Sequence, residues 1–317
     1  MALPEVVLRT AEDIKALRVQ GARNVAKAAL DAIIKLLETH PSDIKDSVVS
    51  AVKVLAATRP TEPALRDAMT FVLRKLAETE DPGELIAAIR NYEQEMVDAE
   101  RRIAEIGSRK IPDGGTVITH CHSSTAINVL VEAHRQGKDF KVIVTETRPR
   151  YQGKLTARDL LSAGIPVVYV VDSAAYFFMH DADVYLTGAD AITSDGYVAN
   201  KIGTALMAVA ARRFDVPYYV AATTLKYDPV TAAGYWEPIE ERDPREVIDP
   251  SELPGAEIRN PAFDLTPPDL VTGIISEIGI YGPQVFPLMV MQHRHIDPSL
   301  EEEIALFRLA SGGSQDS

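Results

Sequence analysis

The sequence predicts an α/β protein in which an N-terminal helical domain precedes a Rossmann-like parallel sheet domain with helices on both faces. Residues 1–107 carry helical patterning that proline and glycine interrupt. After Gly107, short apolar runs rich in β-branched residues alternate with helical stretches, which is typical of a parallel sheet covered on both faces. Residues 311–317 are small and polar. We therefore expect domains at 1–107 and 108–310, followed by a disordered tail.

The composition is that of a soluble globular protein. The 317 residues are 46% apolar and 25% charged, which is enough for a large core. A net charge of -13 argues against a nucleic-acid partner or an anionic membrane surface. No membrane-length apolar run and no signal peptide are visible, so we expect a cytoplasmic protein. Cys121 is the one cysteine, which excludes an intrachain disulfide and a multi-cysteine metal site.

Helices are expected throughout the first domain. Residues 10–13 resemble a capping box that opens a short helix. After an interruption at 21–24, an alanine-rich helix is expected over 25–37. Another is expected to begin at 41–42 and to end at 58–61, because a residue that precedes a proline favours an extended backbone.

The longest predicted helix covers residues 84–106, and Gly107 is expected to end it. Its apolar side chains recur in alternating steps of four and three residues, which places them on one face. We expect this seam to pack on its own domain or against a twin subunit. The seam consists of Leu85, Ile89, Tyr92, Met96, Ala99, Ile103 and Ile106.

The second domain is expected to alternate strands and helices. A G-x-G-x-x-G motif does not follow the first strand, so a dinucleotide fingerprint is absent. The acidic, proline-rich residues 236–261 are expected to form a surface excursion. Strands are expected at 116–119, 141–145, 167–171, 184–186 and 218–222. Helices are expected at 124–135, 156–162, 174–179 and 200–214, with a last helix at 271–277.

Cys121 follows the first strand directly, where the next helix is expected to begin. A helix N-terminus stabilises a thiolate, so we expect the pKa of this thiol to be lowered. His120 and His122 flank the cysteine, but three consecutive side chains cannot all face one zinc ion. No metal site is expected, and we place His120 beneath the sheet and His122 towards the site.

A carboxylate, an amide and a cation follow the fourth strand. Asp190 lies two residues beyond Gly188, and Asn200 and Lys201 are expected at the head of the next helix. Such groups at the carboxyl ends of parallel strands are typical of a binding site in an α/β fold. The alternative is an aspartate that only caps a helix.

Hydroxyl groups and further cations follow the other strands at the same edge. Ser123, Ser124 and Thr125, with nearby backbone N–H groups, would suit a phosphate, and simple N-capping is the alternative. Arg148 ends the second strand and Lys226 follows the fifth, although Arg148 could also be an ordinary surface arginine. Because the protein as a whole is acidic, cations that converge on one edge predict a phosphorylated small molecule as the ligand.

Five motifs together resemble the superfamily of translation initiation factor 2B α/β/δ subunits and sugar-phosphate isomerases. Within it, most of residues 10–280 are similar to archaeal-type ribose-1,5-bisphosphate isomerases. The resemblance implies an aldose–ketose isomerase that converts ribose 1,5-bisphosphate to ribulose 1,5-bisphosphate in nucleoside monophosphate salvage, without a metal or another cofactor. The motifs are T-H-C-H-S-S, E-T-R-P-R-Y-Q-G-K-L-T-A, D-S-A-A, G-A-D-A-I-T-S-D-G-Y-V-A-N-K-I-G-T and F-D-L-T-P-P-D-L.

The resemblance also implies roles for individual residues. Cys121 would accept the C2 proton as a thiolate, and protonated Asp190 would help to open the furanose ring, leaving a phosphoenolate. Arg148 would be either a substrate contact or a structural partner. Cations in both domains could hold the two phosphates, so we expect the domains to close on the substrate. The implied substrate-binding residues are Gly21, Ala22, Arg23, Asn24, Arg59, Ser123, Ser124, Thr125, Arg148, Asn200, Lys201 and Lys226.

Two other functions stay open. Methylthioribose-1-phosphate isomerases share the cysteine and aspartate motifs but typically have Asn where this chain has His122. Arg23 and Arg59 favour a second phosphate over a methylthio group. A regulatory subunit similar to initiation factor 2B α would bind a phosphosugar or nucleotide without converting it, and the intact catalytic pair argues against it. The resemblance further implies a homo-oligomer, a dimer or a trimer of dimers, with the 84–106 seam and the last helix as candidate contacts.

Overall fold

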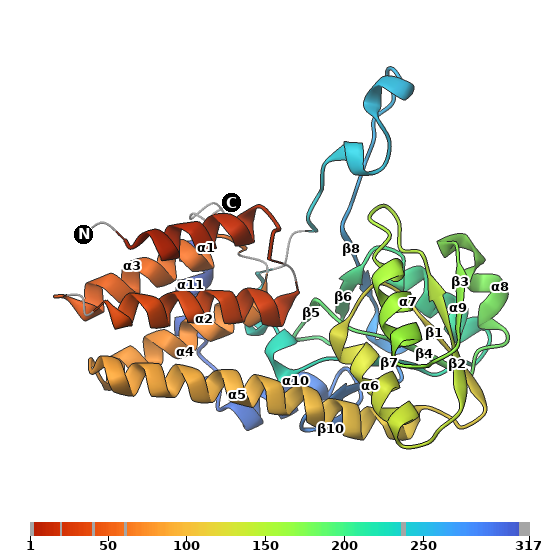
Figure 1. The fold of residues 1–317 in the computed structure, drawn as a ribbon, viewed down its shortest axis with the longest axis horizontal. Helices are drawn as coiled ribbons and strands as arrows, with labels where there is room; N and C mark the ends of the chain where they lie inside the picture. Colours follow the sequence, from red (N-terminus) through yellow and green to blue (C-terminus); the bar gives the residue numbers. More distant parts are fainter. Residues whose placement is uncertain (1–2, 20, 40–41, 60–61, 236–238, 311–317) are drawn as a thin grey trace. The chain divides into compact units, whose positions relative to one another are not determined.

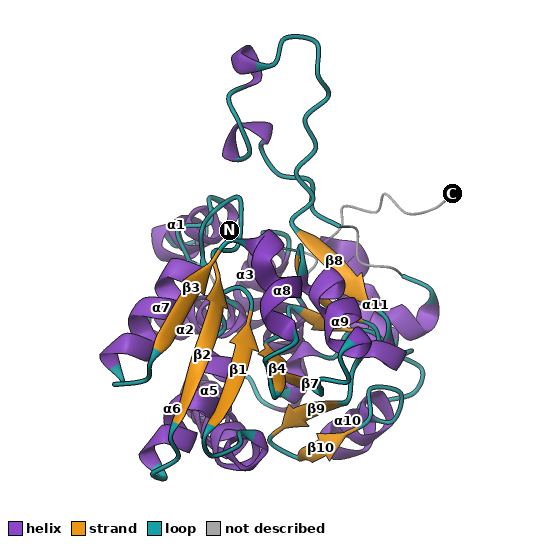
Figure 2. Cartoon of the chain, turned by 90° about the vertical axis from the view of Figure 1, so that its right-hand side faces the viewer, coloured by secondary structure: helices purple, strands orange, loops and turns teal. Residues whose placement is uncertain are grey.

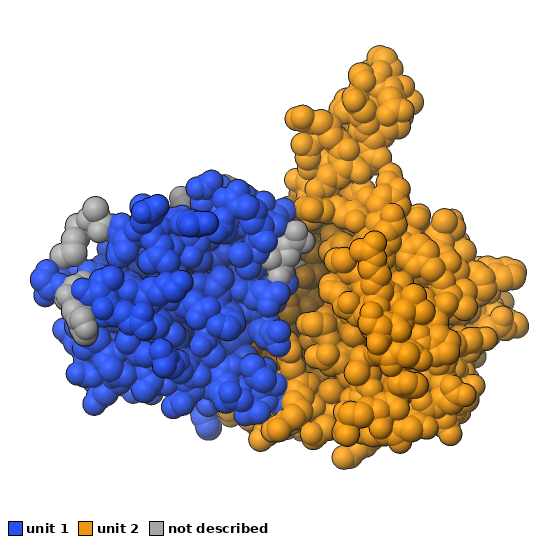
Figure 3. Space-filling view, viewed as in Figure 1, with its two compact units in different colours: residues 1–98, 228–236, 295–317 blue, residues 99–227, 237–294 orange. Residues whose placement is uncertain are grey.

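The computed structural model describes residues 3–19, 21–39, 42–59, 62–235 and 239–310 (Figure 1). The chain divides into two compact units, which Figure 3 colours separately. Unit 1 comprises Met1–Asp98, Asp228–Trp236 and His295–Ser317, and unit 2 comprises Ala99–Tyr227 and Glu237–Arg294. This division corrects the expected one, because the boundary lies earlier than residue 107 and two later segments return to the helical unit. The tail expected at 311–317 lies outside the described residues.

Unit 1 is built from helices that each bury an apolar face. In α2 (Ala22–Glu38), the fully buried residues Ala26, Ala29 and Ile33 follow one another at steps of three and four. This spacing is what the sequence pattern over 25–37 predicted. The other helices of the unit are α1 (Glu5–Lys15), α3 (Ile44–Ala56), α4 (Pro63–Glu78), the first part of α5 (Pro82–Gly107), the short η4 (Pro229–Ala233) and α11 (Glu301–Ala310).

Charged side chains attach the two returning segments to the N-terminal helices. Arg66 of α4 is buried, and its guanidinium lies 2.6 Å from a carboxylate oxygen of the fully buried Asp228. The same guanidinium lies 5.2 Å from the ring centre of Phe307 in α11. Arg74 of α4 also forms ion pairs with the first turn of α11. Because these partners are far apart in the chain, no local sequence pattern predicts their contact.

The seam of α5 is buried in its own chain. Ile89, Tyr92 and Met96 are at most 5% exposed, and the Tyr92 ring stacks on Phe71 with 4.5 Å between ring centres. Further along the helix, Ile103 joins the apolar core of unit 2. Of the two expected alternatives, packing within the chain is the one observed. The seam is therefore not an open surface for a twin subunit.

Unit 2 is centred on a seven-stranded sheet with the strand order β10-β9-β7-β4-β1-β2-β3. Only β10 and β9 pair antiparallel in this sheet as described, and the other neighbouring strands are parallel. The five strands expected from the sequence are confirmed, with small shifts at their ends. The strands are β1 (Gly115–Thr119), β2 (Phe140–Thr145), β3 (Val167–Val170), β4 (Val184–Thr187), β7 (Tyr218–Ala221), β9 (Gly273–Ser276) and β10 (Gly279–Tyr281).

Helices cover both faces of this sheet, as Figure 2 shows. On one face, α6 (Ser124–Arg135), α7 (Gly153–Ser162) and the end of α5 pack on alternate strand residues such as Val117, Val142 and Leu186. On the other face, α8 (Ala175–Met179) contacts β1, and α9 (Thr204–Arg213) contacts β4. The predicted fold class is confirmed. An N-terminal helical part is followed in the chain by a mainly parallel sheet that lies between two layers of helices.

A second sheet of three antiparallel strands corrects the prediction for residues 200–214. Its central strand β6 (Val198–Lys201) pairs with β5 (Ala191–Ile192) and β8 (Phe263–Thr266), and α9 begins only after it. Asn200 and Lys201 therefore end a strand rather than begin a helix. The helix expected at 271–277 is also wrong, because these residues contain β9, and α10 (Phe286–Arg294) was not predicted. A short apolar run does not by itself distinguish a strand from a helix.

Residues 239–261 extend away from the rest of unit 2 in both Figure 1 and Figure 2. They contain two short 3-10 helices, η5 (Pro244–Glu246) and η6 (Pro250–Glu252), and most of their side chains are exposed. At the base, the N–H of Arg242 donates to the carbonyl of Asn260 at 2.9 Å. Residues 236–238 lie outside the described part, and for the remainder the predicted surface excursion is confirmed.

Candidate active site

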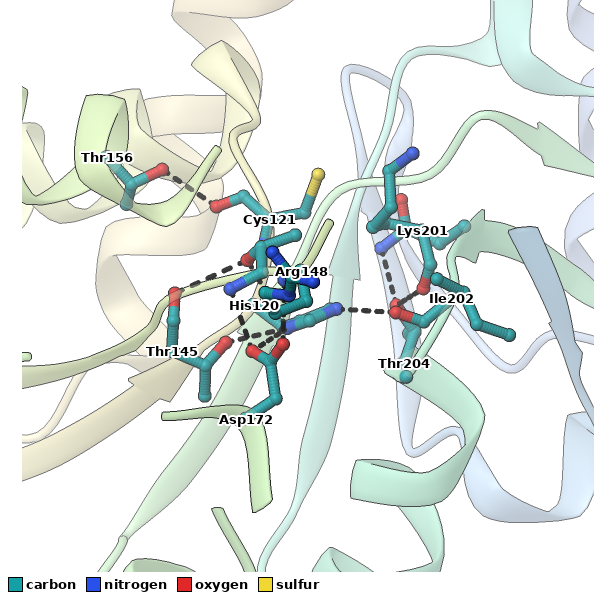
Figure 4. Close-up of polar contacts among 12 residues, drawn as sticks. His120, Cys121, Thr145, Arg148, Thr156, Asp172, Lys201, Ile202 and Thr204 are labelled. Carbon is teal, nitrogen blue, oxygen red and sulfur yellow. Dashed lines mark hydrogen bonds and ion pairs between the residues drawn. The ribbon is translucent and has the colours of Figure 1, made fainter. Parts of the chain in front are cut away.

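Cys121 lies between the end of β1 and the start of α6, and both sides of its backbone are held. Its N–H donates to the hydroxyl of Thr147 at 2.9 Å, and its carbonyl accepts from the hydroxyl of Thr156 at 2.7 Å. Its backbone is left-handed, with a φ of 70°, which is uncommon for a residue with a side chain. In Figure 4 its sulfur points away from these hydrogen bonds and extends in the same direction as the amine of Lys201.

The environment of Cys121 keeps its thiol protonated. The pKa of Cys121 is raised to about 12: burial is the largest cause, the positive charge of Lys201 lowers the pKa, and the negative charge of Asp190 raises it. The expected lowering of this pKa is therefore wrong for the free site. The helix N-terminus that should favour the thiolate begins beyond the cysteine, with Ser123 as the N-cap of α6. The loss of hydration is the larger effect.

The loop that carries Asp190 packs against the loop that carries Cys121. A β-carbon added at Gly188 would lie 2.2 Å from Oγ and 2.6 Å from Cβ of Ser123, so only glycine allows this approach. The N–H of Asp190 donates to the carbonyl of Ala199 in β6 at 2.9 Å. The two residues to which the resemblance assigns catalysis therefore lie on adjoining loops at the carboxyl ends of β1 and β4.

Lys201 supplies a positive charge to the same place from β6. It is only 5% exposed, and its Nζ lies 4.9 Å from the ring centre of Phe263 on β8. Its charge acts on the pKa values of both Cys121 and His120, lowering each. The neighbouring Asn200 is also buried, and its amide donates to the hydroxyl of Thr204 at 3.0 Å.

His120 is buried and links three segments of the chain. Its Nδ1 lies 2.6 Å from the hydroxyl of Thr145, and its Nε2 lies 2.9 Å from the carbonyl of Ile202. Burial lowers the pKa of His120, so the ring is neutral. Because a carbonyl only accepts, Nε2 carries the proton and Thr145 donates to Nδ1. His120 thus joins the ends of β1 and β2 to the residue after Lys201, as Figure 4 shows.

The hydroxyl cluster after Cys121 begins α6. Ser123 is the N-cap, and its Oγ accepts the N–H of Ala126 at 3.3 Å, so the capping alternative is confirmed for this residue. Ser124 is exposed and Thr125 is half-buried in the first turn. Their position at a helix N-terminus agrees with the expected phosphate cradle, which stays a prediction.

Arg148 is held by structural partners. Its guanidinium donates to the hydroxyl of Tyr151 and to the carbonyl of Val247, both at 2.8 Å. Val247 belongs to the extension formed by residues 239–261, so Arg148 anchors that extension to the loop after β2.

Lys226 ends the short helix η3 (Thr224–Lys226), whose Thr224 hydroxyl donates to Glu277 at 2.5 Å.

The remaining predicted residues belong to unit 1. Gly21 is the N-cap of α2 with a φ of 84°, and Ala22, Arg23 and Asn24 form the first turn of that helix. Arg59 follows α3, and its guanidinium lies 3.8 Å from a carboxylate oxygen of Glu62. Their role in substrate binding stays a prediction.

Three residues of this region were missed by the sequence analysis. Thr147 and Asp172 belong to motifs that carry the resemblance, but nothing in their local pattern signals that they hold Cys121. Asp264 accepts the N–H groups of Gly203 at 2.7 Å and of Ala205 at 3.1 Å, and so caps α9 beside Lys201. Burial raises the pKa of Asp264 to about 6.

The described residues lack two kinds of feature. Among them, no group of three or more His, Cys, Asp or Glu side chains has the arrangement of a metal site. None of the helices within the described ranges is both long and apolar enough to cross a membrane.

Comparisons with known proteins show to which family the chain belongs. Residues 18–283 match the model of the initiation factor 2 subunit family. A curated relative from Archaeoglobus fulgidus, ribose 1,5-bisphosphate isomerase, is 41% identical over 95% of this chain and 98% of its own length. A methylthioribose-1-phosphate isomerase from Pelotomaculum thermopropionicum is 39% identical over 86% of this chain and 82% of its own.

The fold itself has solved counterparts. The crystal structure of the Pyrococcus horikoshii OT3 translation initiation factor eIF-2B superposes with a TM-score of 0.79 at 35% identity, covering 89% of this chain and 98% of that one. The family match, the curated relatives and the structural likeness each extend over most of the sequence. The chain belongs to the initiation factor 2 subunit family.

Proposed function

We propose that this protein is an isomerase that converts ribose 1,5-bisphosphate to ribulose 1,5-bisphosphate, within nucleoside monophosphate salvage. The observation that carries the proposal is the meeting of a buried thiol, a carboxylate and a buried ammonium group at one edge of the sheet. Cys121, Asp190 and Lys201 supply these groups. A regulatory subunit has no need of a proton-transfer pair, and the relative from Archaeoglobus fulgidus with 41% identity carries the same activity in its name.

The chemistry requires one proton to leave Cys121 before the reaction begins. Once the substrate is bound, the thiol proton passes to the carboxylate of Asp190, which leaves a thiolate beside Lys201 and an acid at Asp190. The thiolate removes the C2 proton, and the released electron pair forms the C1–C2 double bond while the C1–O4 bond breaks. Asp190 protonates O4. The products of this step are a phosphoenol and an opened sugar chain.

The second half returns both protons. Cys121 gives its proton to C1, the hydroxyl at C2 becomes the ketone, and its proton goes to Asp190. The sum is an isomerisation with no oxidant, metal or nucleotide consumed. The positive charge of Lys201 stabilises the thiolate of Cys121 and the negative charge that develops as the C1–O4 bond breaks, in a site from which water is largely excluded.

The proposed reaction also requires residues that bind the two phosphates of the substrate. In unit 2, Lys201, Lys226 and the N–H groups of the first turn of α6 supply positive charge and hydrogen-bond donors. In unit 1, Arg23 and Arg59 are proposed as contacts to the other phosphate. Replacing Arg23 by Ala should raise KM for the bisphosphate with little change in kcat, which steady-state kinetics would show.

The deciding experiment is proton NMR of the purified protein with ribose 1,5-bisphosphate in deuterated water. We expect conversion to the ketose, lost in Cys121→Ser and in Asp190→Asn while circular dichroism of both variants stays that of the wild type. Methylthioribose 1-phosphate is run in parallel, because a relative with that activity is 39% identical. Turnover of the methylthio sugar alone would replace the proposed substrate. Normal activity in either variant would contradict the mechanism.

We also propose a homo-oligomer, a dimer or a trimer of dimers. Exposed apolar side chains gather on the edge strand β3 and on α8 and α9, where Phe177 is 74% and Leu206 is 73% exposed. A second copy of this chain is the partner we propose for this surface. It replaces the two contacts expected from the sequence, since the α5 seam is buried and residues 271–277 are not a helix. Light scattering that gives the monomer mass at all concentrations would contradict it.

The remaining parts of the proposal come from the sequence. A cytoplasmic location and a reaction without cofactor, nucleic acid or membrane stay predictions.

A further inference from the structure

We infer that Thr147 and Asp172 are positioning residues that hold Cys121 in the conformation needed for proton transfer. The inference rests on the proposed function. These two side chains do not touch the substrate and act on the reaction only through Cys121.

The backbone around Cys121 is in an unfavourable conformation that needs outside support. Cys121 has a φ of 70° and Thr147 a φ of 61°, so two residues with side chains adopt left-handed backbones. A β-branched residue is especially rare in this region. Strain of this kind persists only where surrounding groups fix it, and it is frequent at active sites.

Thr147 supplies the support to Cys121 directly. Its Oγ accepts the N–H of Cys121 at 2.9 Å and donates towards the carbonyl of Thr145 at 3.3 Å. On the other side, the hydroxyl of Thr156 holds the Cys121 carbonyl at 2.7 Å. With the N–H and the carbonyl both held, the orientation of the Cα–Cβ bond is fixed, so the sulfur can move only by rotation about that bond.

Asp172 in turn fixes Thr147. Its two carboxylate oxygens accept the N–H groups of Thr147 and of Arg148, each at 2.7 Å. A carboxylate that accepts two consecutive N–H groups holds the peptide between them firmly, because both bonds are charge-assisted. Asp172 begins the short helix after β3, Thr147 follows β2 and Cys121 follows β1. The hydrogen bonds among these residues therefore connect the ends of three neighbouring strands.

A role in folding alone and a role in positioning the thiol predict the same hydrogen bonds, so the test must report on the sulfur itself. The chain has a single cysteine, and alkylation by iodoacetamide followed by intact mass therefore reports Cys121 alone. The rate of alkylation as a function of pH measures both access to the thiol and its pKa. A group that only stabilises the fold would change the unfolding temperature without altering this profile.

The central comparison is Thr147→Val against Thr147→Ser. Valine keeps the shape and the branching of threonine but has no hydroxyl, whereas serine keeps the hydroxyl. We expect Thr147→Val to lower kcat for ribose 1,5-bisphosphate by about 100-fold with KM nearly unchanged, because the sulfur no longer reaches C2 correctly. We expect it to shift the alkylation profile as well. Thr147→Ser should retain the kcat and the alkylation profile of the wild type.

Asp172→Asn is the second variant and covers the case in which Thr147→Val does not fold. Asparagine keeps one oxygen acceptor and places an N–H₂ group against the second backbone N–H. We expect Asp172→Asn to lower kcat by less than Thr147→Val does. Its profile of alkylation rate against pH should change in the same direction as that of Thr147→Val. Folding of every variant is checked by circular dichroism and thermal unfolding.

The outcomes separate this inference from the proposed function. A folded Thr147→Val protein with the kcat and the alkylation profile of Thr147→Ser would overturn the inference that Thr147 and Asp172 position Cys121. A wild-type protein that does not convert ribose 1,5-bisphosphate would overturn the proposed function, and the alkylation comparison would still decide whether Thr147 and Asp172 position the thiol.

Discussion

Replacing Gly188 by alanine should damage the active site far more than the fold. The added β-carbon would meet Oγ of Ser123 at 2.2 Å and its Cβ at 2.6 Å. The φ of Gly188 lies outside the left-handed region, so backbone strain is not the reason. The perturbation is a collision between the loop that carries Asp190 and the loop that carries Cys121.

The size of the effect follows from these distances. Carbon atoms in contact lie about 3.5–4.0 Å apart, so the two loops must separate by about 1 Å. Overpacking of this kind costs about 1–3 kcal/mol of stability. Rotation of Ser123 gives no escape, because its Cβ also collides and its Oγ caps α6. Since a displacement of about 1 Å between reacting groups costs on the order of 100-fold in rate, we expect kcat to fall by that factor.

The assay compares kcat and the unfolding temperature of Gly188→Ala with those of Gly282→Ala. Gly282 is exposed and an added β-carbon there would meet nothing within 4 Å, so this control should behave as the wild type. Combining Gly188→Ala with Ser123→Gly removes the collision and should restore activity to that of Ser123→Gly alone. A Gly188→Ala protein with wild-type kcat would refute the close apposition of the two loops.

Three further results are expected. Arg66→Met should lower the free energy of unfolding by about 3 kcal/mol, as measured by chemical denaturation, because it leaves the buried carboxylate of Asp228 unpaired. Arg74→Met, which removes two more exposed ion pairs, with Glu302 and Glu303, should cost less than about 1 kcal/mol. Asp264 has a pKa raised to about 6 by burial, so it binds its proton more tightly in the folded protein than in the unfolded chain. The stability of the wild type relative to Asp264→Asn should therefore be greatest below about pH 4 and decline as the pH rises to about 6; an unchanged difference between the two pH values would be contrary to this. Arg148→Ala should speed hydrogen exchange in residues 239–261 by releasing Val247 while leaving KM nearly unchanged, whereas a large rise in KM would show that Arg148 contacts the substrate.

The accuracy of the sequence predictions differs between elements for a physical reason. The five strands and the helix that became α6 were located correctly because apolar runs, β-branching and turn residues are local signals. β6 and β9 were mistaken for helices because a strand of four residues is too short to show its period. The returning helix α11 was missed because its place in unit 1 depends on Arg66 and Arg74, which lie far away in the chain.

By itself the sequence determined the fold class, the edge of the sheet at which polar groups collect, and the residues that bring Cys121 and Asp190 there. These follow from hydrophobic periodicity and from the rule that parallel strands end at a common edge. Only the tertiary structure decided the state of the thiol and its support. The pKa of Cys121 depends on how much water its neighbours exclude, and its left-handed backbone depends on Thr147 and Asp172 from other strands. Desolvation and contacts between distant loops are properties of the folded chain, and no short stretch of sequence encodes them.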